Sequence, residues 1–182
     1  MRFSKLSIPG AFLIEPVVFS DERGIFMETW ESQKFALAGI DVSFVQDNHS
    51  SSRRGVLRGL HYQVRHPQAK LVRVVSGEVF DVAVDLRRSS PTFGSWIGVR
   101  LSSANRMMLF IPEGVAHGFL TMSDNAELVY KCSDYYDPAS ERTLRWDDRD
   151  VGVEWPLADE VPLILSSRDR CGTLLKEAEC FP

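Results

Sequence analysis

Cysteine, positive charge and long apolar runs are all scarce in this sequence. Its 182 residues include only three cysteines, Cys132, Cys171 and Cys180, and no two of them have CxxC spacing. An odd, unpatterned set of cysteines argues against a disulfide framework and against a zinc site, and it fits a reducing compartment. We therefore expect a cytoplasmic protein with free thiols.

The negative net charge argues against two further classes of protein. The formal net charge is -4, which disfavours a nucleic-acid or anionic-membrane surface. No apolar run approaches the roughly 20 residues that a membrane helix needs. The N-terminal stretch has one short apolar run, broken by Pro16, and no small-residue cleavage site, so no signal peptide is expected. Neither nucleic acid nor a membrane is an expected partner.

The composition is that of a globular protein with a full core. Hydrophobic residues make up 44% and charged residues 25% of the chain. A chain of this length and composition can bury its core as one domain. No stretch is long or polar enough for a linker, and no segment repeats at a fixed period. The sequence therefore predicts a single domain, residues 1–182.

Most of the apolar residues lie in short alternating segments that predict β-strands. In residues 78–86, Phe80, Val82 and Val84 share one face while Asp81 and Ala83 share the other. Turn-forming residues separate the segments. Many evenly spaced strands without alternating helices indicate an antiparallel sandwich or barrel. The seven predicted strands of this region are residues 56–63, 70–77, 78–86, 95–102, 107–112, 117–122 and 126–133.

The two ends of the chain are less regular. Residues 12–19 predict a strand interrupted by Pro16, and residues 25–30 and 42–50 predict two more. Residues 31–39 have helical spacing and end at Gly39, which predicts a short helix. Residues 51–55 predict a loop, and a second short helix is expected near Asp147–Val151.

The stretch from Gly55 to Gly77 gives the first indication of chemistry. Because side chains alternate along a strand, His61 and Gln63 share one face. Lys70 likewise shares a face with apolar valines, so its ammonium enters an apolar interior. A buried ammonium is costly unless an anion pairs with it, at rest or during a reaction. This stretch therefore predicts a catalytic site, although a histidine considered alone is more often structural.

Two blocks of sequence resemble the paired motifs of the cupin superfamily, whose jelly-roll barrels bind a metal through His-x-His, Glu and a distant His. The blocks are Gly55–Gly77 and Pro112–Thr121, the second with His117. Gln63 stands at the second histidine position, Lys70 at the glutamate position and Thr121 at a closing asparagine. A protonated lysine cannot ligate a cation and would repel it. The resemblance therefore implies an all-β, cupin-type jelly-roll barrel with a few short helices and with acid–base groups in place of a metal.

Longer strings resemble the nucleotide-sugar 3,5-epimerases of the rhamnose pathway, over about Ile8 to Asp169. They include FVQDNHS, GVLRGLHYQ, IPEGVAHGFLT and YKCSDYYDP. Ala69, where the family often has glycine, is a mild departure. The resemblance implies conversion of dTDP-4-dehydro-6-deoxy-D-glucose to dTDP-4-dehydro-L-rhamnose by proton abstraction next to the 4-keto group, without a cofactor or metal. It also implies a homodimer.

The same resemblance implies a role for each matching side chain. His61 matches the base, Asp169 the carboxylate that orients it, Lys70 the cation beside the 4-oxygen, and Tyr130 the acid on the opposite sugar face. These roles suit the chemistry, because a neutral imidazole can remove an α-proton if the enolate is stabilised. Arg168 stands where the family usually has lysine. The residues implied to bind the substrate are Arg23, Glu28, Gln46, Asp47, Asn48, Arg58, His117, Glu141 and Arg168.

Three other functions stay open at this point. A mono-epimerase that inverts only carbon 3 or carbon 5 would keep the same base and lysine. A metal-dependent cupin enzyme is disfavoured by Gln63 and Lys70. A non-catalytic sugar-nucleotide-binding module would not need a base and an acid on opposite faces of the sugar.

Overall fold

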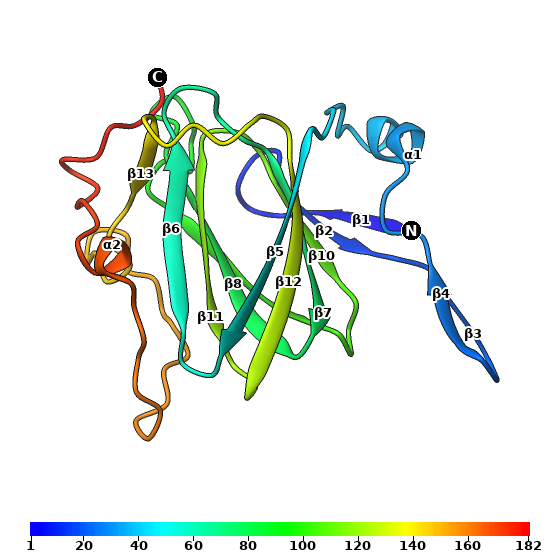
Figure 1. Cartoon of the computed structure of the whole chain (residues 1–182). Helices are drawn as coiled ribbons and strands as arrows, with labels where there is room; N and C mark the ends of the chain where they lie inside the picture. Colours follow the sequence, from blue (N-terminus) through cyan, green and yellow to red (C-terminus); the bar gives the residue numbers. More distant parts are fainter.

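Two antiparallel β-sheets face each other in the computed structural model, which describes residues 1–182 (Figure 1). The larger sheet has six strands in the order β1-β2-β10-β7-β12-β5, and the smaller has five in the order β13-β6-β11-β8-β9. The strands of the larger sheet are β1 (Arg2–Lys5), β2 (Phe12–Glu15), β5 (Gln46–Arg53), β7 (Lys70–Ser76), β10 (Met108–Ile111) and β12 (Asn125–Cys132). Those of the smaller are β6 (Leu57–Gln63), β8 (Glu78–Asp85), β9 (Trp96–Ser102), β11 (Val115–Thr121) and β13 (Glu141–Thr143).

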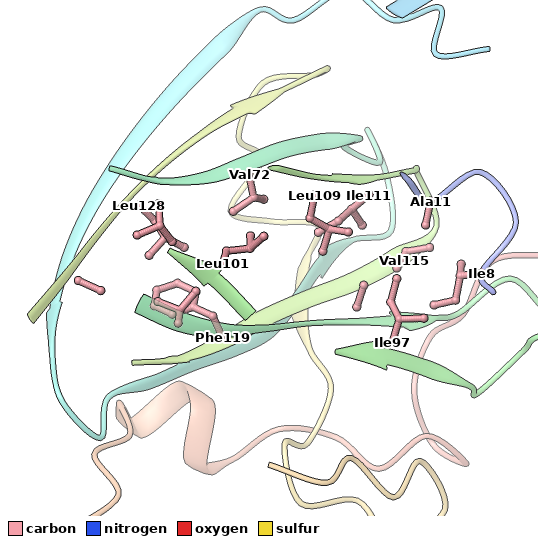
Figure 2. Close-up of a cluster of buried hydrophobic side chains, with 14 residues drawn as sticks. Ile8, Ala11, Val72, Ile97, Leu101, Leu109, Ile111, Val115, Phe119 and Leu128 are labelled. Carbon is pink, nitrogen blue, oxygen red and sulfur yellow. The ribbon is translucent and has the colours of Figure 1, made fainter. Parts of the chain in front are cut away.

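Apolar side chains from both sheets fill the space between them (Figure 2). Val72 and Leu128 enter from the larger sheet, and Leu101 and Phe119 enter from the smaller one. These side chains alternate with residues on the outer faces, as strand geometry requires. The predicted all-β, jelly-roll fold is therefore confirmed, and all seven strands predicted between residues 56 and 133 are present.

The first helix, α1 (Ser32–Leu37), forms where the sequence predicts it. The Glu31 side chain accepts hydrogen bonds from the backbone N–H groups of Gln33 and Lys34, which caps the helix. Phe35 is fully buried and packs with Trp30 against the outside of the larger sheet. Neither α1 nor the second helix, of four residues, has the length and apolar character needed to cross a membrane.

The prediction of a second helix near Asp147–Val151 is wrong. Residues 147–152 form turns, because the Asp148 side chain accepts hydrogen bonds from the backbone N–H groups of Asp150, at 2.8 Å, and Leu175, at 2.6 Å. Such side-chain bonds compete with helix formation. The second helix is instead α2 (Ser167–Arg170), in a segment that reads as a charged loop.

The predicted boundaries of one strand are also wrong. β5 begins only at Gln46 and continues through Arg53, whereas residues 51–55 were expected to form a loop. The serines of β5 are held by pairing with β12, in which Ser52 lies opposite Ala126. The interruption at Pro16 predicted within residues 12–19 is confirmed, and it separates β2 from β3 (Val18–Asp21). β3 pairs with β4 (Gly24–Met27) in a separate hairpin that projects away from both sheets (Figure 1).

Candidate active site

A cavity of about 360 Å³ lies between the two sheets, and both sheets supply its walls. From the smaller sheet come His61 on β6 and His117 on β11. From the larger come Asn48 on β5, Lys70 on β7 and Tyr130 on β12. The cavity is therefore bordered by polar and titratable side chains from strands that are far apart in the sequence.

His61 is paired with a buried carboxylate. Its Nε2 lies 2.7 Å from Oδ1 of Asp169, which is the one buried residue of α2. Burial alone raises the pKa of Asp169, but hydrogen bonds from His61, Ser166 and the backbone N–H of Gly59 lower it to about 2. An ionised carboxylate can only accept, so Nε2 of His61 carries the proton and Nδ1 is left as the basic nitrogen.

Ser166 is a part of this arrangement that sequence reasoning did not identify. Its hydroxyl donates to Oδ2 of Asp169 at 2.6 Å and accepts from the Asp169 N–H at 3.1 Å. It is also the N-cap of α2. The S-x-x-D spacing of Ser166 and Asp169 was the available signal for this turn.

Lys70 is only 8% exposed and begins β7 directly opposite Cys132 on β12. Burial lowers the pKa of its ammonium, and the nearby Cys132, Asp81 and Glu141 oppose that effect. No side chain forms a hydrogen bond or an ion pair with the ammonium. Lys70 is thus an unpaired cation at the cavity wall, where it is available to a negative charge that forms on a bound molecule.

Tyr130 lies on the opposite wall from His61. It belongs to β12 in the larger sheet, pairs with Val72 and Asn48, and packs against the interior cluster, so its side chain points inward as predicted. Burial raises the pKa of its hydroxyl. The hydroxyl therefore keeps its proton at neutral pH and can donate it.

Close contact between β6 and β11 brings their side chains together. A Cβ on Gly118 would lie 2.5 Å from the carbonyl oxygen of Arg58, and one on Gly59 would lie 2.6 Å from the Cα of Gly118. Real Cβ contacts are not this short, so both positions need glycine. The pairing places His61 directly opposite His117.

His117 forms a second histidine–carboxylate pair. Its Nε2 lies 2.9 and 3.0 Å from the two carboxylate oxygens of Asp81, a residue with no exposed surface. The sequence placed Asp81 on the face of its strand away from Phe80 and Val82, but gave it no function. Alternation alone did not show that this face of β8 is the inward one; in the structure Val79 and Ala83, on the same face, lie in the core between the sheets.

Several predicted binding residues line the rest of the cavity. Arg58 donates from Nε to the Ser52 hydroxyl at 2.9 Å, which ties the two sheets together at this edge. Glu141 accepts from the Tyr136 hydroxyl at 2.7 Å and forms an ion pair with Arg168. Tyr136 is half exposed beside this pair and was not predicted. The predicted residues that line the cavity are His61, Lys70, Tyr130, Gln46, Asn48, Arg58, His117, Glu141 and Arg168.

Three predicted binding residues do not line the cavity of this chain. Arg23 lies in the exposed β3–β4 hairpin and pairs with Asp21 at 2.6 Å. Glu28 follows that hairpin and pairs with Lys34 at 2.7 Å. Asp47 points to the outer face of β5, where Lys131 donates to it at 3.0 Å. None of the three side chains lines the cavity, so their predicted contact with a substrate stays a prediction.

The side chains at the cupin ligand positions do not fit a metal. The amide of Gln63 is occupied by backbone, donating to the carbonyls of His66 and Tyr135 and accepting from the N–H of Asp137. Lys70 repels cations. No group of three or more His, Cys, Asp or Glu side chains is placed to hold a metal ion. Gln63 instead anchors the 134–137 segment beside the cavity.

Taken together, the cavity holds a basic imidazole, an unpaired ammonium and a protonated phenol. A base can remove a proton from carbon when a cation stabilises the anion that results. An acid on the opposite wall can then return a proton to the other face. This arrangement suits inversion at a carbon next to a carbonyl.

Comparisons with known proteins agree with this chemistry. The family model described as dTDP-4-dehydrorhamnose 3,5-epimerase matches residues 5–177. The protein of that name from Pseudomonas aeruginosa is 54% identical, with 100% of both chains covered. A Legionella pneumophila dTDP-6-deoxy-D-glucose-3,5-epimerase, solved with dTDP-4-keto-L-rhamnose, superposes with a TM-score of 0.94 at 46% identity, covering 98% of this chain and 94% of that one. A 3'-monoepimerase from Streptomyces bikiniensis, solved with dTDP-quinovose, gives 0.87 at 40%, covering 94% and 86%.

Proposed function

The chain belongs to the dTDP-4-dehydrorhamnose 3,5-epimerase family, and we propose that it converts dTDP-4-dehydro-6-deoxy-D-glucose to dTDP-4-dehydro-L-rhamnose. The observation that carries this function is the meeting of His61, Lys70 and Tyr130 around one cavity. Each of the three supplies a different requirement of inversion next to a ketone. The protein is accordingly an isomerase of the rhamnose pathway.

The reaction begins with proton removal by His61. Nδ1 takes the proton from the carbon next to the 4-keto group, and the imidazolium that forms is stabilised by Asp169, 2.7 Å from Nε2. The electron pair of the broken C–H bond passes into the ketone and forms an enolate. The Lys70 ammonium offsets the charge on the enolate oxygen, which lowers the barrier to its formation.

The reaction is completed from the other wall. The Tyr130 hydroxyl gives its proton to the same carbon from the opposite face of the sugar, so the C–H bond is re-formed with inverted configuration. The phenolate then regains a proton from solvent, and His61 loses its proton. Carbons 3 and 5 both flank the ketone, so two such cycles invert both centres.

Side chains at the rim of the cavity are assigned to bind the nucleotide portion of the substrate. Guanidinium groups match phosphate oxygens, so Arg58 and Arg168 are assigned to the diphosphate and sugar. The amides of Gln46 and Asn48 supply hydrogen bonds to the nucleotide. Since the Arg58 side chain is already anchored on Ser52, it binds with little loss of side-chain entropy.

We also propose that the chain works as a homodimer, as one cytoplasmic domain of residues 1–182. β5 is an eight-residue strand at the edge of the larger sheet, and unpaired edges favour pairing with a second chain. The β3–β4 hairpin exposes Phe19 and Phe26, at 63% and 71%. A second copy that covers this hairpin would bring Arg23 and Glu28 to the neighbouring cavity, where the family resemblance assigns them.

Proton NMR of the purified protein with dTDP-4-dehydro-6-deoxy-D-glucose in deuterium oxide, without added metal, tests this function. Deuterium at carbons 3 and 5 supports double epimerisation. Label at one carbon only would favour the mono-epimerase alternative, which the structural similarity to a 3'-monoepimerase keeps in view. Nucleotide-sugar binding without label would indicate a binding module, and activity that chelators abolish would indicate a metal enzyme.

A further inference from the structure

Asp81 is a fully buried carboxylate in contact with His117, which lines the cavity, and the catalytic cycle above gives it no part. It lies in β8 with its side chain on the inward face, and Nε2 of His117 contacts both of its oxygens, at 2.9 and 3.0 Å. No other side chain bonds to it. A buried carboxylate lowers the stability of the fold, so its position next to a reaction site indicates a role in that site.

The two histidine–carboxylate pairs of the cavity are arranged alike. His61 and His117 lie directly opposite each other on β6 and β11, and each has Nε2 on a carboxylate. In both cases the remaining ring nitrogen, Nδ1, is not engaged by a protein side chain. A histidine whose one nitrogen is held by a carboxylate has a fixed orientation and tautomer.

We propose that Asp81 is a positioning residue of the epimerase: it fixes the His117 ring so that Nδ1 is free for a sugar oxygen. This proposal rests on the proposed function. His117 carries the hydrogen bond to the substrate, and Asp81 acts through it. The same carboxylate also opposes the lowering of the Lys70 pKa by burial.

Asp81 is also one of the groups that oppose the effect of burial on the pKa of Lys70. Burial lowers the Lys70 pKa, while Cys132 on β12, Asp81 on β8 and Glu141 on β13 oppose this. Burial raises the pKa of Cys132, so its thiol is neutral at neutral pH. Glu141 is already paired with Arg168. Around His117, the facing titratable groups are Asp81 and, across the strand pair, His61.

Replacement of Asp81 by asparagine keeps the size of the side chain and removes its charge. For Asp81→Asn we expect kcat to fall about 10- to 100-fold, the usual cost of losing an outer-shell partner of a functional histidine. If Lys70 must carry its proton for turnover, the alkaline limb of the kcat profile should move to lower pH, because Asp81→Asn removes an anion that raises the pKa of Lys70. Binding of dTDP, measured by calorimetry, should change little because Asp81 does not line the cavity.

Asp85→Asn is the matched control. Asp85 is also fully buried on β8, but its partners are Arg87, Ser90 and Thr92 in a turn rather than the cavity. Its replacement should lower the free energy of unfolding without moving the pH profile. If Asp81→Asn gave the wild-type profile and kcat, or changed them no more than Asp85→Asn does, the proposal would be wrong.

A measurement on the unmodified chain covers the case in which Asp81→Asn does not fold. In ¹⁵N-histidine-labelled protein, with the His117 signals assigned by their loss in His117→Gln, we expect a proton on Nε2. A proton on Nδ1 alone would refute the proposal. This result does not depend on turnover, so failure of the wild-type chain to epimerise would reject the proposed function and leave the Asp81–His117 assignment to be decided by NMR.

Discussion

The buried Lys70 of the active site lowers the stability of the folded protein. Its ammonium is buried with no direct ion pair, which destabilises the folded state, since the nearby Asp81 and Glu141 only partly offset the loss of water around the charge. A thioether chain of similar length would fill the same space without that penalty. The lysine is therefore explained by the anion that forms during the reaction and by no contact at rest.

Lys70→Met should consequently stabilise the protein and inactivate it. We expect the free energy of unfolding to rise by about 1–2 kcal/mol, as when buried charges are replaced by apolar groups. We expect kcat to fall by about 10²- to 10³-fold, the cost of losing one stabilising group at an oxyanion. Urea unfolding and initial rates measure the two effects. Lys131→Met, at a surface ion pair, should change neither by much, and a loss of stability in Lys70→Met would contradict this account.

Asp169 makes stability depend on pH in a defined direction. Its pKa is lowered from 3.8 to about 2 in the folded state, so its contribution, about 2 kcal/mol at 1.36 kcal/mol per pKa unit, is complete above about pH 4 and is lost as pH falls toward 2. Asp169→Asn should therefore be less stable than the parent at pH 7, and the difference in their free energies of unfolding should be smaller at pH 3. Urea unfolding at several pH values measures it.

Asp85→Asn separates this effect from catalysis. The pKa of Asp85 is also about 2, because hydrogen bonds from Arg87, Ser90 and Thr92 outweigh the effect of burial. The difference in free energy of unfolding between Asp85→Asn and the parent should therefore also be smaller at pH 3 than at pH 7. Only Asp169→Asn should lose turnover, because only Asp169 contacts His61. A stability gap that stayed constant between pH 7 and pH 3 in both variants would show that charge is not the cause.

Strands explain why so much of the fold and site could be predicted. Alternation along each strand predicts the face on which His61, Lys70 and Tyr130 lie. The arrangement of the strands in two facing sheets (Figure 1) then brings these faces together around one interior. Asp169 lies instead on a four-residue helix in a charged segment, where no periodicity exists, so only the family resemblance indicated it. Its contact with His61 spans 108 residues, and local pattern does not encode such a contact.

The wrong predictions have tertiary causes. The helix expected near Asp147–Val151 is prevented by hydrogen bonds from backbone N–H groups to Asp148, one of them from Leu175, far along the chain. The extension of β5 into residues 51–53 depends on pairing with β12 and not on the strand propensity of serine. In both places tertiary partners override local preference.

The close contact of β6 and β11 makes Gly118 a sensitive position. Its added Cβ would meet backbone atoms of Arg58 and Gly59, which cannot move as a side-chain tip can. Gly118→Ala should therefore lower the free energy of unfolding by about 1–3 kcal/mol, as overpacking does, and reduce kcat by displacing His61 and His117. Thermal unfolding and initial rates check both.

Gly39→Ala provides the comparison for Gly118. A Cβ at Gly39 would have nothing within 4 Å, although the φ of +92° strains any other residue. This variant should lose about 1 kcal/mol of stability and keep its kcat. Equal kcat values for Gly118→Ala and the parent would mean that the strand contact does not control the position of the histidines.

The exposed apolar side chains of the β3–β4 hairpin are the strongest sign of assembly. If a second copy covers them, Phe26→Ser should shift the protein toward the monomer, because a buried phenylalanine contributes about 1.5–3 kcal/mol. Light scattering after size exclusion should show about twice the 20.6 kDa chain mass for the parent and a lower mass for the variant at equal concentration. Leu37→Ser, at a position 89% exposed on α1, should stay dimeric; a monomeric parent would refute the dimer.

Assembly would also explain why Arg23 lies outside the cavity of its own chain. If Arg23 serves the neighbouring subunit, two inactive variants should complement each other. In a mixed dimer of Arg23→Ala and His61→Asn, one cavity combines the intact His61 of the first chain with the intact Arg23 of the second. The other cavity lacks both groups. Mixing the variants under conditions that allow subunit exchange should therefore restore turnover well above either alone, to at most about a quarter of the wild-type rate per chain when subunits pair at random.

The same mixture distinguishes the alternative in which Arg23 folds back over its own cavity. In that case every cavity of the mixed dimer keeps one of the two defects, and mixing adds nothing to the sum of the separate activities. His61→Asn mixed with Lys70→Met is the negative control, because His61 and Lys70 line one cavity of one chain and cannot be exchanged between subunits. Complementation by Arg23→Ala but not by Lys70→Met would mean that the catalytic groups belong to single chains while the substrate is held by the dimer.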